Sequence, residues 1–195
     1  MIYNQITPLA SLILRFYAKC FTFPYEEMNY ELQHQYRVIE REAVTEEETN
    51  HVDQILTIIN YYQGAEIKDL RDDYVNLFTS NQDVKAPCPM IASEFLSMYA
   101  SHYDPDKISD SIWESGIPIN PDEPIDSILN YLEYLSLLCQ EYSESEEKYF
   151  NVELFLKEHI LIWIPQFCEA LYKVAQVEFY REVAAGLKNY LFSLQ

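Results

Sequence analysis

The sequence predicts an all-α protein, and three observations support this fold class. Only three glycines occur in 195 residues, which is few for a sheet protein that needs many tight turns. Apolar residues recur at spacings of three and four along most of the chain, whereas no segment alternates cleanly with a period of two. Hydrophobic residues make up 49% of the chain, which is enough for a packed core. We therefore expect one domain over residues 1–195, built as a bundle of about eight or nine helices.

Four helices are predicted in the N-terminal half of the chain. Apolar spacing indicates a first helix from about residue 6 that stops before Pro24, and a second over residues 25–39. Thr45 and Glu48 have the spacing of a capping box, so a third helix begins there, and we expect Gly64 to end it in the left-handed conformation. A fourth helix covers residues 67–78, and a proline-bearing loop over 81–90 follows it.

The C-terminal half contains the least regular segment and the most apolar one. Ser93 is expected to cap a short helix that runs to Tyr103. Residues 104–124 hold four prolines and a glycine, and they form the candidate hinge or functional loop. A strongly periodic helix over 125–138 comes next, and then an apolar stretch over 150–174 in which Pro165 should kink or divide the helix. A last helix covers about 177–194.

Charge restricts the class of partner. The chain carries 13 Lys and Arg against 32 Asp and Glu, which gives a formal net charge of −19. Such a chain repels nucleic acid and anionic membrane surfaces, so we expect cationic or apolar partners, no nucleic acid and no membrane insertion. Most of the excess lies in residues 26–53 and 104–147, whereas residues 148–195 are balanced. These acidic segments fit a solvated surface and also a docking surface for a basic ligand.

Targeting and cysteine patterns favour a cytoplasmic protein. The apolar stretch over residues 8–23 contains Arg15 and Lys19 and lacks a small-residue cleavage site, so it reads as a core helix. The four cysteines lie far apart without a C-x-x-C pair, and we expect free thiols.

No motif of catalysis or phosphate binding is evident in the sequence. There is no glycine-rich phosphate loop, no G-x-S-x-G elbow and no H-E-x-x-H helix, so we expect neither enzyme activity nor a cofactor. One alternative is a metal-binding bundle, because Glu31 with His34 and Glu48 with His51 have the Glu-x-x-His spacing of di-iron sites. Both pairs lie in polar stretches, which does not favour a buried metal. Another alternative is an acidic helical adaptor.

Five short motifs, in order, resemble those of the TorD/DmsD/NarJ family of redox-enzyme maturation chaperones. Their residues are Leu70, Arg71, Asp73, Tyr74, Leu77 and Phe78; Pro87, Pro89 and Ser93; Glu123, Pro124 and Asp126; Phe155, Leu156, His159, Trp163, Pro165 and Phe167; and Phe179, Tyr180 and Ala184. Order and spacing agree with the family from about residue 9 to the C-terminus. The chain departs from the pattern at Ser127, where the family usually has a histidine.

The resemblance implies a cytoplasmic all-α chaperone for a molybdenum-cofactor oxidoreductase. Such a chaperone binds the twin-arginine leader of the catalytic subunit, or another part of its apo form, and holds the subunit back until the cofactor is inserted. A leader of this kind has a basic region followed by an apolar run, which matches an acidic surface rich in tyrosine. The oligomeric state, monomer or dimer, stays open.

The resemblance also nominates residues that bind the leader or client. Glu123 and Asp126 are the candidates for arginine contact, and Asp126 also suits a cap of the helix that starts near Ile125. Ser93 and His159 complete the polar candidates. The aromatic candidates are Tyr74, Phe78 and Trp163, although their helical spacing also suits the core. Asp73 is expected to anchor a neighbouring backbone segment or an arginine.

Overall fold

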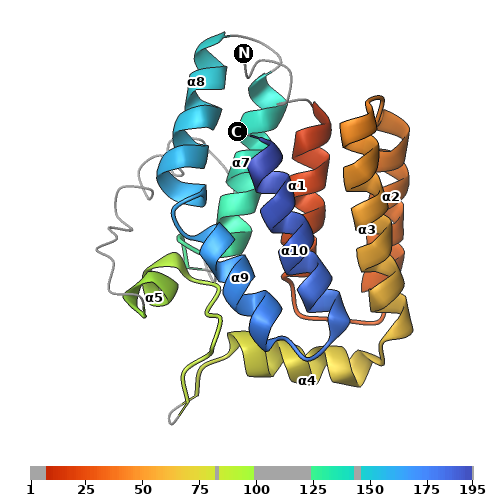
Figure 1. The fold of residues 1–195 in the computed structure, drawn as a ribbon, viewed down its shortest axis with the longest axis vertical. Helices are drawn as coiled ribbons and strands as arrows, with labels where there is room; N and C mark the ends of the chain where they lie inside the picture. Colours follow the sequence, from red (N-terminus) through yellow and green to blue (C-terminus); the bar gives the residue numbers. More distant parts are fainter. Residues whose placement is uncertain (1–7, 82–83, 99–123, 143–145, 195) are drawn as a thin grey trace.

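The computed structural model describes residues 8–81, 84–98, 124–142 and 146–194. Within these ranges the chain forms nine α-helices and one π-helical segment. The described residues form no strand, and their only β-type pairing is one isolated antiparallel bridge. The all-α bundle that the sequence predicts is confirmed for the described residues (Figure 1). The candidate hinge over 104–124 lies, apart from Pro124, outside them.

The N-terminal helices are α1 (Pro8–Cys20), α2 (Met28–Glu42), α3 (Glu46–Gly64) and α4 (Ile67–Phe78). Thr45 and Glu48 form the expected capping box, in which each side chain accepts a hydrogen bond from the other residue's amide. The expectation for Gly64 is wrong: it is the last helical residue, its φ is not positive, and the extended Ala65 ends the helix at φ −91°. An extended residue suits this position because α4 begins two residues later.

The C-terminal helices are α5 (Ala92–Ser97), α7 (Ile128–Tyr142), α8 (Glu146–Phe155), α9 (Ile164–Val174) and α10 (Glu178–Ser193). Between α8 and α9 the chain passes through a π-helical turn, η1 (Leu156–Ile160), so the long apolar stretch is divided as expected. Pro165 lies in the first turn of α9, where its missing amide costs no helical hydrogen bond.

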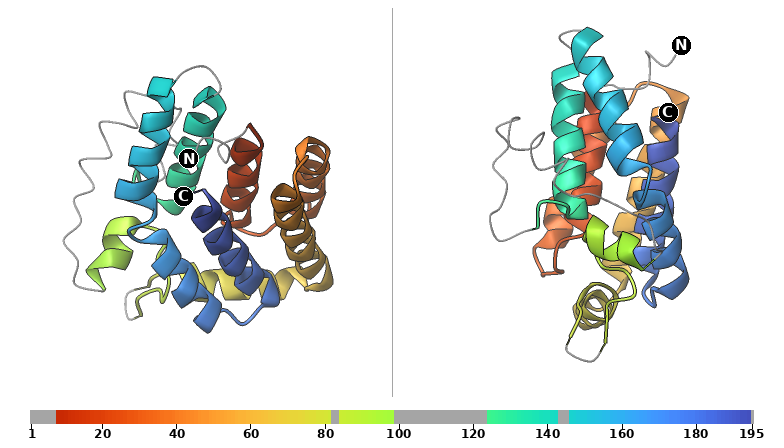
Figure 2. Two further views of the ribbon diagram at one scale, coloured as in Figure 1. Left: turned by 45° about the horizontal axis from the view of Figure 1, so that its top comes forward. Right: turned by 90° about the vertical axis from the view of Figure 1, so that its left-hand side faces the viewer.

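Neighbouring helices of the bundle run antiparallel to each other. Helix α1 packs along α7 and α2, and α10 packs between α9 and α3. Helix α4 crosses one end of the bundle, and the α2–α3 loop lies at the opposite end, beside the start of α1 and the end of α10 (Figures 1 and 2). These two ends are the parts of the fold that expose loops and helix termini. No helix in the described ranges is long and apolar enough to cross a membrane.

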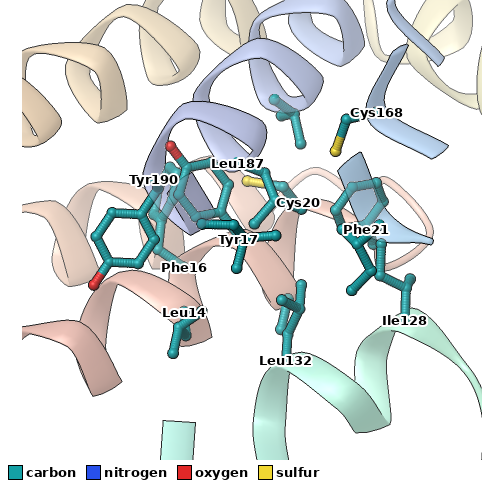
Figure 3. Close-up of a cluster of buried hydrophobic side chains, with 14 of the residues drawn as sticks. Leu14, Phe16, Tyr17, Cys20, Phe21, Ile128, Leu132, Cys168, Leu187 and Tyr190 are labelled. Carbon is teal, nitrogen blue, oxygen red and sulfur yellow. The ribbon is translucent and has the colours of Figure 1, made fainter. Parts of the chain in front are cut away.

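The centre of the bundle is one aromatic and aliphatic core to which α1, α7, α9 and α10 all contribute (Figure 3). Its fully buried members include Leu14, Phe16, Tyr17, Cys20, Phe21, Ile128, Leu132, Leu187 and Leu191. The four cysteines are free and buried, which confirms the expectation from their spacing. Burial raises the pKa of the Cys88 and Cys139 thiols to about 12, so both stay protonated at neutral pH.

Candidate functional site

Asp126, one of the two candidate arginine contacts, is buried at the start of α7 and holds α5. Its side chain is 5% exposed, and Oδ2 accepts a hydrogen bond of 2.9 Å from the amide of Ser93. The Asp126 carbonyl also accepts from the amide of Ala92 at 2.9 Å. The carboxylate therefore caps the first turn of a helix that lies 33 residues earlier in the chain.

The cap assignments from the sequence need two corrections. Ser93 is the second residue of α5 and does not cap it, because the Asp126 carboxylate occupies that role across the junction. Asp126 in turn does not cap its own helix: the hydroxyl of Ser127 accepts from the amide of Asn130 at 3.2 Å instead. The position of the family histidine is thus filled by a buried serine that directly precedes α7 and caps it.

Two backbone segments are joined at this point, and we call them the 90–93/124–128 junction. The Ile128 amide donates to the Met90 carbonyl at 2.8 Å, and Ile91 and Ser127 form an antiparallel bridge. The Asn130 side-chain amide donates to the Pro124 carbonyl at 2.9 Å and closes the turn. The structure therefore brings together two of the family-like motifs. Glu123, the other arginine candidate, immediately precedes the junction in sequence and lies outside the described residues.

The aromatic candidates belong to one continuous chain of ring contacts through the core. The ring centroids of Phe78 and Tyr74 lie 5.0 Å apart. The centroid of Phe167 lies 6.4 Å from that of Phe78 and 5.8 Å from that of Trp163. Trp163 also contacts Phe95 of α5 at 6.1 Å. Phe78 and Trp163 are buried, so in this conformation they support the site rather than line a surface.

Tyr74, on α4, lies where this chain of rings reaches the surface. Its hydroxyl donates to the Phe21 carbonyl at 3.2 Å, and its ring meets the edge of Phe23 at 5.3 Å. Phe23 is 48% exposed, and the Arg71 guanidinium covers its ring at 5.8 Å while donating to the Pro24 carbonyl. Sequence reasoning missed Phe23, because it lies in a loop without helical periodicity.

His159 lies in the π-helical turn and is half-buried against the ring of Phe155, 5.1 Å away. Trp163 follows η1 and has a non-helical backbone at φ −140°. Its indole Nε1 is buried and finds no acceptor among the described residues. The π-helical turn thus leaves His159 half-buried, while Trp163 lies in the core.

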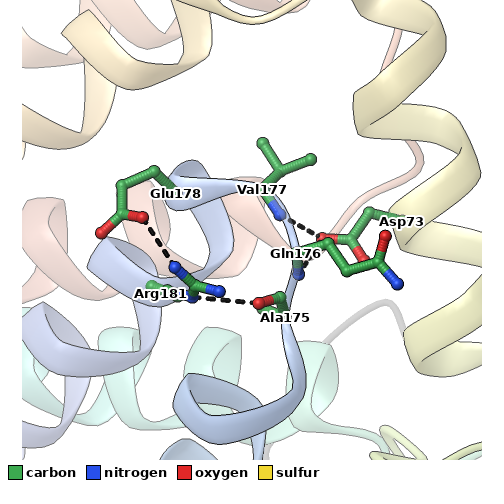
Figure 4. A network of polar contacts seen from close by, with 6 residues as sticks. All are labelled: Asp73, Ala175, Gln176, Val177, Glu178 and Arg181. Atoms are coloured by element: carbon green, nitrogen blue, oxygen red, sulfur yellow. Dashed lines mark hydrogen bonds and ion pairs between the residues drawn. The ribbon is translucent and has the colours of Figure 1, made fainter.

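Asp73 anchors a backbone segment, as the sequence suggested. Its side chain is 3% exposed, and Oδ2 accepts from the amides of Gln176 and Val177 at 3.0 and 2.8 Å (Figure 4). These two amides precede the first turn of α10, where a carboxylate also meets the positive end of the helix dipole. Both family-like aspartates therefore cap helices that are distant in sequence.

The residues of the metal alternative have other roles in the structure. Glu31 pairs with Lys19 at 2.5 Å, and Glu48 is part of the capping box. His34 is exposed, whereas His51 shares a hydrogen bond of 3.1 Å with Ser193. No group of three metal-ligating side chains is present in the part of the chain that the structure describes.

The described residues form an all-helical bundle in which the junction joins α5 to α7. A solved structure described as a putative redox enzyme maturation protein from Archaeoglobus fulgidus shares the fold, with a TM-score of 0.60, 20% sequence identity and coverage of 93% of each chain. A sequence search of the curated proteins found no match.

Residues 41–169 match the model of the family called nitrate reductase delta subunit. The chain belongs to this family, which is the NarJ/TorD-type family of maturation chaperones. This family consists of maturation chaperones for redox enzymes and not of catalysts. The match spans the α4 motif, the junction and the π-helical turn, and the resemblance read from the short motifs is confirmed.

Proposed function

We propose that this protein is a cytoplasmic chaperone for the catalytic subunit of a molybdenum-cofactor oxidoreductase. It binds the twin-arginine leader or the apo form of that subunit and assists cofactor insertion before export or assembly. Family membership supports the class of client. The observation that carries the proposal is the junction, where Asp126 binds Ser93 and brings two family-like motifs together.

Electrostatics suits a basic leader. A net charge of −19 attracts a cationic segment from a distance and increases its association rate. Within the junction, Asp126 is buried and already accepts two backbone amides through its side chain and carbonyl. We therefore assign Asp126 and Ser93 to positioning, and we assign the arginine contact itself to Glu123.

The aromatic candidates divide in the same way. Tyr74, together with the exposed ring of Phe23, offers an apolar surface to the leader's hydrophobic run. His159, half-buried on the π-helical turn, is a further candidate for contact with the client. Phe78 and Trp163 hold α4, α5 and α9 in register behind these residues.

The test is calorimetric titration with the leader peptides of molybdoenzymes from the same organism. We expect micromolar or tighter binding that weakens as salt rises from about 50 to about 300 mM, because ion pairs at an exposed surface are screened. Replacing both leader arginines by glutamine should weaken binding at least about tenfold. The variant E123Q should reproduce that loss, whereas D122N, its matched neighbour, should not.

The proposal distinguishes the leader from the mature subunit. If the leader peptide does not bind but the leaderless apo-subunit does, the contact with the mature part is the relevant one. If neither binds, and the protein purifies without any molybdoenzyme subunit, the chaperone proposal is wrong and an acidic adaptor replaces it.

A further inference from the structure

We propose that a cavity at the α2–α3 loop end of the bundle is a second client contact, which takes a basic side chain flanked by apolar residues. The cavity has a volume of about 360 Å³, within the range of sites that hold ligands. It lies among the start of α1, the start of α3 and the end of α10, at the opposite end of the bundle from α4 (Figure 1). This inference rests on the proposed function, because it assumes a protein client.

The cavity combines a buried apolar lining with acidic side chains. The buried side chains of Leu9, Ile13, Tyr190 and Leu194 line it. Glu47 and Glu48, in the first turn of α3, also line it, and Glu47 is exposed. No lysine or arginine is among its lining residues in the described part of the chain. A cationic group on an apolar stem therefore complements it, whereas an anion does not.

The two glutamates have different roles. Glu48 accepts hydrogen bonds from the amides of Val44 and Thr45, so its carboxylate builds the loop. Glu47 is exposed and does not take part in the capping box. Its carboxylate supplies the charge that an incoming cation meets.

His51 does not compete with a cationic ligand at neutral pH. Burial lowers its pKa from the ordinary value of 6.5, although Glu47 and Glu48 oppose this shift. The ring packs edge-on against Tyr190 at 4.9 Å, and Nε2 shares a hydrogen bond with Ser193. The imidazole thus adds a polar but neutral wall.

Val44 favours a peptide over a small cation. It belongs to the cavity lining, yet its side chain is 85% exposed. An apolar side chain at the mouth of an acidic cavity stabilises a ligand that continues past the cavity with apolar residues of its own. A basic residue beside an apolar run is also the chemistry of the proposed client leader.

The test uses two pairs of variants and one synthetic probe. The probe is a peptide of about 20 residues that carries two adjacent arginines before a leucine- and alanine-rich run. E47K reverses the charge at the cavity, and E46K makes the same change in the same helical turn at a residue that does not line it. V44W fills the mouth, and V84W places the same bulk on another exposed valine.

We expect E47K and V44W each to raise the dissociation constant of the peptide at least about fivefold. E46K and V84W should leave it within about twofold of the wild-type value. All four positions are exposed, so circular dichroism should show wild-type folding. If wild-type protein binds the peptide but E47K and V44W bind it equally well, the cavity is not a client contact, while the proposed function stands. If wild-type protein binds no leader and no apo-subunit, the proposed function itself fails.

A third outcome assigns the cavity to the chain itself. If deletion of residues 2–7 and E47K lower the melting temperature equally, and E47K leaves peptide affinity unchanged, the N-terminal residues are the occupant. That result also overturns the proposal.

Discussion

The carboxylate of Asp126 caps α5 through the amide of Ser93, at 2.9 Å, although the two residues lie 33 positions apart. Asp73 repeats this arrangement at a greater distance, because it binds the amides of Gln176 and Val177 ahead of α10. Each aspartate is buried and belongs to a family-like motif. In this chain both motifs therefore supply helix caps between distant segments. Under the proposed function, these caps position the loops that the client meets.

Removing the Asp126 carboxylate should destabilise the junction. D126A leaves the Ser93 amide without its acceptor, and we expect a loss of about 1–2 kcal/mol in the free energy of unfolding. D126N keeps one acceptor oxygen and should lose less than half of that. Urea denaturation measures both, with the exposed Glu133→Ala on α7 as the control. Equal stability of D126A and wild type would mean that the bond contributes nothing.

Asp73 should matter more, since two amides depend on it. D73A is expected to cost about 2–3 kcal/mol, because both amides lose a charged acceptor and the α10 dipole loses its anion. D72A removes an exposed carboxylate from the adjacent position of α4 and should change stability by less than about 0.5 kcal/mol. Thermal unfolding of the two variants makes the comparison. A similar small effect for both would contradict the capping role.

Gly186 should not tolerate a methyl group. A Cβ at this position of α10 would lie 2.6 Å from the Tyr17 hydroxyl and 2.9 Å from a side-chain carbon of Gln54. Alanine normally stabilises a helix relative to glycine by about 1 kcal/mol, but we expect G186A to destabilise the protein by about 1–3 kcal/mol. G64A is the control, because no atom lies within 4 Å of a Cβ there. A stabilising effect of G186A would show that α10 packs less tightly against Tyr17 and Gln54 than the distances imply.

Tyr17 provides the second half of this test. Its hydroxyl is buried and has no hydrogen-bond partner among the described residues, so Y17F should leave stability unchanged or raise it by up to about 1 kcal/mol. Y17F also removes the nearest atom that opposes G186A. A double-mutant cycle should therefore show a favourable coupling of about 1 kcal/mol. Strict additivity would contradict the contact between these two residues.

His51 should make stability fall as the solution becomes acidic. Its pKa is lowered by burial, so between the folded value and the ordinary 6.5 the unfolded chain binds more protons than the folded one. Stability from this residue is present above pH 6.5 and is lost as the pH falls below it. H51Q should therefore have a shallower loss of stability than wild type between about pH 7 and pH 5, measured by urea denaturation. Parallel curves would mean that His51 titrates alike in both states.

The sequence predicted the helices well because their determinants are local. Apolar spacing, the Thr45 and Glu48 box and Pro165 each act within one or two helical turns, and the structure confirms all three. Gly64 was assigned wrongly because glycine permits, but does not require, a left-handed end.

The candidate site was only partly predictable. A capping aspartate looks the same in sequence whether its amide partner is three or a hundred residues away, so the targets of Asp126 and Asp73 needed the fold. The cavity beside Glu47 was invisible for the same reason, since its lining comes from three separate segments. Helical spacing did indicate that Phe78 and Trp163 belong to the core.

The most direct test of the account is the molybdenum content of the client. The molybdoenzyme subunit that binds this protein should be purified from cells that contain or lack this protein, and its molybdenum content should be measured by mass spectrometry. We predict nearly one molybdenum per subunit with the chaperone and a small fraction of that without it, restored by the wild-type gene. Equal molybdenum content in the two preparations would contradict the proposed role in maturation.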